Sequence, residues 1–83
     1  MATTKYMNGE KTMIDKYELL KDTLRSYLNW AKRTPACAQD FYAMAMGYVG
    51  GAKMALLYAG KDEEYEDLHN LWEKLEPAFK ELL

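Results

Sequence analysis

The segment of residues 35–59 is the feature of this sequence that most limits what the chain can fold into. It begins at Pro35, which suits the first position of a helix, and it is followed by Gly60, which suits the position after a helix ends. Within it only Asp40 and Lys53 are charged. A helix that is apolar or small almost all round is normally buried on every side, and two neighbours in a small bundle cannot cover it. The sequence therefore predicts a helix over residues 35–59 that needs contacts from outside its own chain.

Small residues recur every four positions along this predicted helix and form a ridge with little side chain. The ridge consists of Ala43, Gly47, Gly51, Ala55 and Ala59. Glycine inside a helix costs about 1 kcal/mol relative to alanine, and close approach by another helix is the compensation we expect. Such ridges also occur in membrane spans, but the twelve residues between Asp40 and Lys53 are fewer than the ~20 that a span needs. We therefore predict a homo-oligomer joined through Ala43, Gly47 and Gly51, with no membrane partner.

A first amphipathic helix is predicted over about residues 12–34. Thr12 can cap its first turn, and Asp15 follows three positions later as an acidic form of the capping box. The preceding Asn8-Gly9 is a turn signal. An apolar stripe at helical spacing then consists of Met13, Tyr17, Leu20, Leu24, Tyr27 and Ala31.

A third helix is predicted over residues 62–83, with Asp62 as its cap. Its apolar stripe has heptad spacing and consists of Tyr65, Leu68, Trp72, Leu75, Phe79 and Leu82. Pro77 interrupts the stripe, so we expect a kink near residue 77. The expected fold class is all-α, with residues 1–83 forming one three-helix domain that assembles into a homo-oligomer.

Size and composition exclude several classes of protein. A chain of 83 residues and 9.6 kDa holds one small domain, and 49% hydrophobic residues are too many for a disordered chain. One cysteine excludes a disulfide scaffold and a thiolate zinc site. The net charge of −2 argues against binding duplex nucleic acid. No signal peptide is recognisable, so a cytoplasmic location is the expectation.

Charge is unevenly distributed along the chain. Residues 1–33 contain seven Lys or Arg against four Asp or Glu, whereas residues 61–83 contain eight acidic residues against three Lys. One interpretation is a bundle whose basic and acidic helices attract each other. The other is a basic N-terminal surface that recruits an anion.

Few residue patterns in this sequence could support catalysis or metal binding. Glu66-x-x-His69 has the spacing of half a di-iron carboxylate site, but a second copy is missing and a surface histidine is the expectation. Cys37 is expected to be a small buried residue. The sequence has no phosphate-binding glycine loop and no paired general acid and base. We therefore predict neither an enzyme nor a metal or cofactor site.

The segment before the first predicted helix is a candidate ligand site. Tyr6 offers a ring on which a base can stack, Lys11 a positive charge and Thr12 a hydroxyl. Backbone N–H groups at a helix N-terminus favour phosphate in addition.

Four pieces of the sequence carry a resemblance to a known family. They are residues 6–12, Lys16-Tyr17-Glu18-Leu19-Leu20-Lys21, Thr34-Pro35-Ala36-Cys37 and Ala52-Lys53-Met54-Ala55. Their order resembles the phage anti-CBASS sponge family, small helical proteins that sequester cyclic oligonucleotides. In that family a polar loop with an aromatic residue and a lysine precedes a helix opening Arg-Tyr-Glu, a Cys/Pro turn and a helix rich in Ala and Met.

The resemblance implies a function and a set of ligand-binding residues. Members of the family form compact oligomers and bind nucleotides between protomers without cleaving them. Here Tyr6 would stack on a base, Lys11 would pair with a phosphate, Thr12 would donate a hydrogen bond, and Arg25 would contact phosphate through its guanidinium. The expected function is non-catalytic sequestration of a cyclic oligonucleotide second messenger, in the host-cell cytoplasm if the protein is phage-encoded.

Two alternatives remain open on the sequence. The acidic third helix has no counterpart in the family pattern, and it could dock on a basic protein surface as a nucleic-acid mimic does. The chain would then be a protein-binding inhibitor. It could also be a purely structural helical assembly module.

Overall fold

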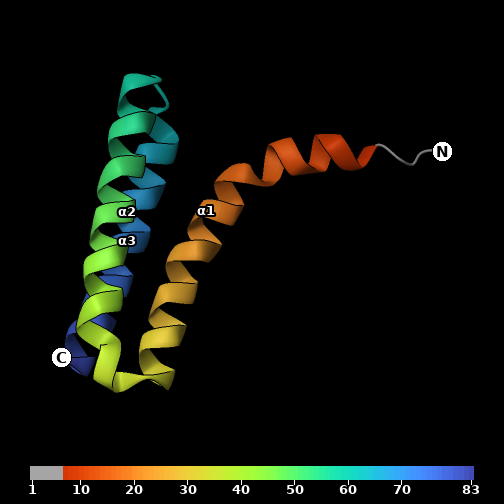
Figure 1. The fold of residues 1–83 in the computed structure, drawn as a ribbon. Helices are drawn as coiled ribbons and strands as arrows, with labels where there is room; N and C mark the ends of the chain where they lie inside the picture. Colours follow the sequence, from red (N-terminus) through yellow and green to blue (C-terminus); the bar gives the residue numbers. More distant parts are fainter. Residues whose placement is uncertain (1–6) are drawn as a thin grey trace.

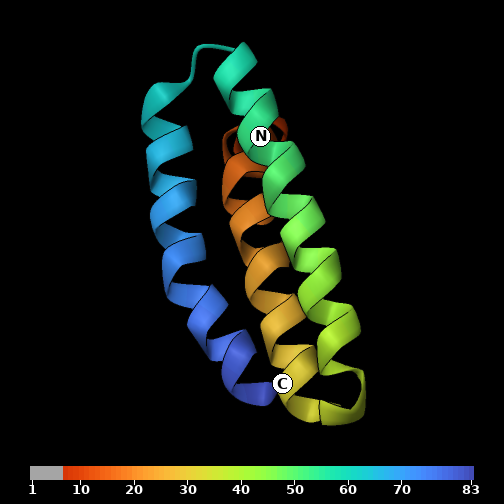
Figure 2. The same cartoon turned by 90° about the vertical axis from the view of Figure 1, so that its left-hand side faces the viewer.

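The computed structural model describes the backbone of residues 7–83 and the side chains of residues 16–83. This part of the chain forms three helices, α1 (Met7–Arg33), α2 (Ala38–Tyr58) and α3 (Asp62–Leu82), with a 3-10 turn (Pro35–Cys37) between the first two. The helices run alternately down, up and down, and each packs against the other two (Figures 1 and 2). The described residues contain no strand, so the all-α prediction is confirmed.

Both connections between helices are short. In each, a defined local structure ends the preceding helix. Pro35 opens the 3-10 turn, and the N–H of Cys37 donates to the carbonyl of Thr34 at 2.9 Å. At the other end of α2, Gly60 has a φ of 72°, the left-handed conformation that glycine adopts without steric penalty. Its N–H donates to Leu57 at 3.1 Å and that of Lys61 to Leu56 at 2.9 Å, the two bonds of a Schellman motif. Gly60 therefore ends the middle helix as the sequence predicts.

The starts of α1 and α2 differ from the sequence prediction. α1 begins at Met7 rather than near residue 12, so the predicted turn at Asn8-Gly9 and the predicted cap at Thr12 are wrong. Once a helix has formed, each added residue gains a hydrogen bond, and this outweighs a weak local turn preference. α2 begins at Ala38 because residues 35–37 take the tighter 3-10 form. α3 continues through Pro77 as one helix and bends over its last turns (Figure 2).

The core is a single cluster to which each helix contributes three fully or nearly buried side chains. They are Leu24, Leu28 and Ala31 from α1, Ala38, Ala45 and Val49 from α2, and Leu68, Trp72 and Phe79 from α3. Three aromatic rings pack beside one another at the α2–α3 contact: Tyr42 is stacked on Trp72 with centroids 6.2 Å apart, and Phe79 lies 5.7 Å and 5.9 Å from the two. The α2 contribution is small in volume, since large side chains from α1 and α3 fill the interior.

Replacement of Leu68 by alanine tests whether this cluster stabilises the bundle. Leu68 is fully buried, so Leu68→Ala should lower the free energy of unfolding by about 3–5 kcal/mol, through lost burial and the cavity left behind. Leu83→Ala is the matched control, because Leu83 is 59% exposed and its truncation should change stability by less than about 0.5 kcal/mol. Urea denaturation followed by circular dichroism measures both. Equal losses for the two variants would contradict this assignment of the core.

Candidate functional site

The outer face of α2 is the most unusual surface of the molecule. Beyond Gln39 and Asp40 in the first turn of α2, we define it as the exposed residues that lie across the helix from the buried Ala38, Ala45 and Val49, namely Ala43, Met44, Met46, Gly47, Gly50, Gly51, Met54, Ala55, Leu57 and Tyr58. All ten are exposed to solvent. Six of the nine large hydrophobic side chains exposed in the described part of the chain belong to α2, and five of these six lie on this face. The outer face carries no charged residue.

This face is uncovered because the two neighbouring helices pack on the opposite side of α2. Ala38, Ala45 and Val49 share one side of α2 and face the core, while the outer face lies across the helix from them. The helix is therefore exposed on one side within a single chain, as its composition predicts for a bundle that offers it only two neighbours.

Lys53, the one charged residue between Asp40 and the end of α2, does not interrupt the outer face. Its ammonium lies 3.0 Å from Nδ1 of His69 and 5.2 Å from the centroid of the Tyr65 ring, both on α3. Aromatic contacts border the face on its other side, where α1 meets α2. Tyr27 lies edge-on to Tyr48 with centroids 6.1 Å apart and to Trp30 at 6.0 Å. The ammonium of Lys53 therefore lies against α3, and the aromatic rings of Tyr27, Trp30 and Tyr48 lie along the opposite border of the outer face.

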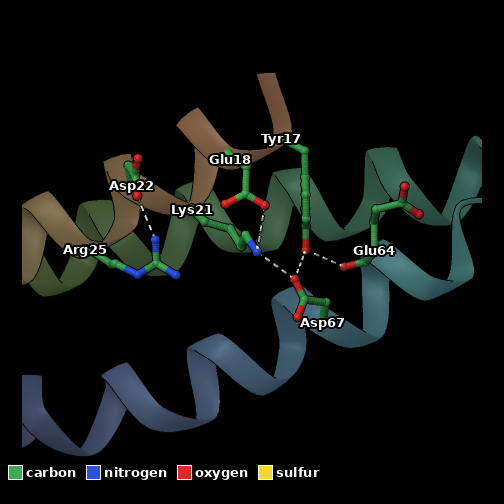
Figure 3. Close-up of polar contacts among 7 residues, drawn as sticks. All are labelled: Tyr17, Glu18, Lys21, Asp22, Arg25, Glu64 and Asp67. Atoms are coloured by element: carbon green, nitrogen blue, oxygen red, sulfur yellow. Dashed lines mark hydrogen bonds and ion pairs between the residues drawn. The ribbon is translucent and has the colours of Figure 1, made fainter. Parts of the chain in front are cut away.

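A polar cluster joins α1 to α3 on the far side of the bundle (Figure 3). The hydroxyl of Tyr17 lies 2.7 Å from Oδ2 of Asp67 and 3.0 Å from the carbonyl oxygen of Glu64. The ammonium of Lys21 donates to the same Asp67 oxygen at 2.9 Å and pairs with Glu18 at 3.2 Å. One carboxylate therefore receives two side chains from α1, which ties the basic helix to the acidic one.

The pKa shifts in this cluster follow from those contacts. The hydrogen bonds from Lys21 and then from Tyr17 lower the pKa of Asp67, while its hydrogen bond to Asp67 raises the pKa of Lys21. Partial burial and the bond to Asp67 raise the pKa of the Tyr17 phenol. Tyr42 shows the same effect between α2 and α3, since its hydrogen bond to Glu76 at 2.6 Å raises its pKa. Each shift favours the protonation state that holds at neutral pH, so these groups bind helices together and are not poised for proton transfer.

Of the four residues expected to bind a ligand, only Arg25 has a described side chain. Arg25 pairs with Asp22 at 2.6 Å on the exposed side of α1 (Figure 3). Tyr6 lies outside the described residues, and Lys11 and Thr12 lie in α1 with side chains outside the described part. The first turns of α1 project away from α2 and α3 (Figure 1). Fourteen positions separate Lys11 from Arg25, roughly 20 Å along a helix.

The other candidates from the sequence have ordinary structural settings. The imidazole of His69 contacts Lys53 and lies 3.8 Å from Glu73, and Cys37 is half-buried in the 3-10 turn. Within the described residues, no group of three or more His, Cys, Asp or Glu is placed to hold a metal ion. No helix in that part of the chain has a stretch long and apolar enough to cross a membrane. The exposure of Met54, Tyr58 and Trp30 was not predicted from the sequence, although the all-round apolar character of residues 35–59 was a signal of it for Met54 and Tyr58.

Comparison of the chain with protein-family models, with curated proteins and with solved structures finds no match.

Asp67→Asn tests the polar cluster between α1 and α3. Because this variant removes a charged acceptor from Tyr17 and Lys21, it should lower the free energy of unfolding at pH 7 by about 1 kcal/mol. A lowered pKa makes the carboxylate stabilising above its unfolded pKa, and this contribution disappears as pH falls through its folded pKa. The difference between wild type and Asp67→Asn should therefore shrink on acidification. Urea denaturation at several pH values measures it.

The control for this experiment is Glu66→Gln, which removes the same charge from the neighbouring position of α3. Glu66 is exposed, and it makes no hydrogen bond or ion pair within the part of the chain that the structure describes. Its replacement should leave stability nearly unchanged at every pH. A loss equal to that of Asp67→Asn would mean that the overall charge of α3 matters and the specific contacts do not.

Proposed function

We propose that this protein is a non-catalytic binding protein that works as a homo-oligomer assembled through the outer face of α2. The observation that carries the proposal is the concentration of exposed apolar side chains on one helix, with no charge among them. Exposed contiguous apolar patches on soluble domains mark interaction sites. Association through a surface of this kind is favourable, because each Å² of apolar area removed from water stabilises the complex by about 25 cal/mol.

The glycines of α2 support the same proposal. A Cβ added at Gly47, Gly50 or Gly51 would meet no atom within 4 Å in the part of the chain that the structure describes. Alanine would therefore fit at all three positions, and it would favour the helix by about 1 kcal/mol at each. Nothing inside the chain requires glycine there, whereas close approach by a second helix would require it.

We propose further, from the resemblance to the sponge family, that the oligomer sequesters a cyclic oligonucleotide. Tyr6 would stack on a base, Lys11 and Arg25 would contact phosphates, and Thr12 would donate a hydrogen bond. The distance between Lys11 and Arg25 along α1 supports a site shared between protomers, in which one chain supplies Lys11 and another Arg25. No reactive pair of nucleophile and base is among these residues, so the bound nucleotide is expected to remain intact.

A second candidate function uses the acidic helix. Asp62, Glu63, Glu66 and Glu81 are exposed on α3, and this charge could dock on a basic protein surface. The chain would then be an inhibitor or an assembly module. Binding of a basic protein that is abolished by neutralising these four residues, with no response to any cyclic nucleotide, would favour this alternative.

Sedimentation analysis tests the assembly. The wild-type chain should sediment as an oligomer at micromolar concentration, and Gly51→Leu should shift it towards the 9.6 kDa monomer, because overpacking at a close helix contact costs about 1–3 kcal/mol. Gly51→Leu should remain folded, since the side chain meets open space in the monomer. Asn70→Leu is the control, because Asn70 is an exposed position of α3 away from the outer face. A wild-type chain that sediments only as monomer would refute the assembly.

Calorimetry with a panel of cyclic di- and trinucleotides tests the ligand. Lys11→Ala should weaken binding roughly ten- to a hundredfold, since a charge-assisted contact contributes about 1.5–3 kcal/mol. Tyr6→Ala should weaken it similarly through lost stacking, worth ~1–3 kcal/mol. Lys74→Ala is the control, because this exposed lysine lies on α3. Absence of binding to every nucleotide would refute this part of the proposal, and recovery of linearised nucleotide would refute its non-catalytic character.

A further inference from the structure

We infer that α2 pairs with α2 of a second copy in an antiparallel arrangement, with a twofold axis between Gly50 and Gly51. This inference rests on the proposed self-association and gives it a geometry. The outer face offers room for a close crossing at this point, because both glycines are exposed and a Cβ on either would meet nothing within 4 Å. Two helix backbones can approach most closely where neither carries a side chain.

Size complementarity around this axis supports the antiparallel direction. In such a pair, residues equally far from the axis on the two helices face each other. Met54 of one copy then faces Gly47 of the other, and Tyr58 faces Ala43. The C-terminal half of the outer face is bulky and exposed, with Tyr58 82% and Met54 47% accessible, while the N-terminal half is small along the same line. Along this line the bulky half of one copy therefore fits against the small half of the other, while Met44 meets Leu57 beside it.

Charge complementarity supports the same direction. Asp40 is exposed in the first turn of α2, and Lys61 is exposed just beyond its last turn. The two residues are equally far from the axis in sequence, so the antiparallel pair places the Asp40 end of each α2 beside the Lys61 end of the other. A parallel pair would place Asp40 against Asp40 and Lys61 against Lys61. Interfaces of this twofold kind are self-complementary, because one patch serves both copies.

A second copy fits this face better than an unrelated partner for these reasons. An unrelated partner would have to present a surface without charges. Its small side chains would have to lie opposite Met54 and Tyr58, and its large ones opposite Ala43 and Gly47. It would also need a positive group at one end and a negative group at the other. The chain itself provides this surface, and its outer face is exposed in the single chain.

Disulfide trapping tests the geometry. Gly47→Cys and Met54→Cys are each made in a Cys37→Ser background and mixed under mild oxidation. The mixed disulfide between the two variants should dominate, identified by mass, because their Cα atoms face each other across the interface. Either variant alone should cross-link poorly, since seven positions separate residues 47 and 54, about 10 Å along the helix, beyond the ~7 Å that a disulfide spans. Asn70→Cys in the same background is the control and should not cross-link.

Charge reversal provides a second measurement on the intact face. Asp40→Lys and Lys61→Asp should each weaken self-association measured by sedimentation, by about two- to fivefold, since exposed pairs contribute up to about 1 kcal/mol. The double variant, which exchanges the two charges, should restore it. If self-association of the double variant were weaker than that of either single variant, both the Asp40–Lys61 contact and the antiparallel direction would be contradicted.

The outcomes separate this inference from the proposed function. A dimer whose Gly47→Cys chains cross-link to one another has parallel α2 helices, which overturns the inference and leaves the self-association in place. A dimer in which neither cysteine cross-links uses another surface, which also overturns the inference. A chain that is monomeric at every concentration overturns both.

Discussion

Only two helices pack against α2, although almost all of its surface is apolar or small, and the rest of the structure depends on this mismatch. Two helices can cover about half of the circumference of a third, and α2 has apolar or small residues over almost all of it. The core takes Ala38, Ala45 and Val49 from one side, and the outer face is left in contact with water. Small domains bury a limited fraction of their surface, so in a chain of 83 residues this uncovered face is a large part of the apolar material available.

The polar contacts of the bundle are arranged so that they leave this face free. Asp67 holds Tyr17 and Lys21 at the contact of α1 with α3, and Glu76 holds Tyr42 where α2 meets α3. Lys53 turns towards His69. These contacts lie at the sides of the bundle that face α3. In the part of the chain that the structure describes, they keep paired charges away from the apolar outer face of α2.

Sequence periodicity predicted the helices well because local spacing decides which face of a helix is apolar. Leu24, Leu68 and Phe79 stand on the predicted stripes and are fully buried. The start of α1 was not predictable from local signals, because the gain from extending a helix that has already formed outweighs the turn preference at Asn8-Gly9. The contact of Tyr17 with Asp67 was not predictable either. Fifty residues separate them, and which side chains meet depends on how far α1 slides along α3, a quantity set by packing in three dimensions.

The proposed self-association would link folding and assembly through the same helix. Glycine at positions 47, 50 and 51 weakens α2 relative to alanine and would permit close contact in a pair. The monomer is thereby less stable than an alanine variant would be, and association would restore the difference through buried apolar area. Since association stabilises the folded state by mass action, the apparent stability of the wild-type chain should rise with its own concentration. A ligand held between protomers would act on the same equilibrium and raise stability and association together.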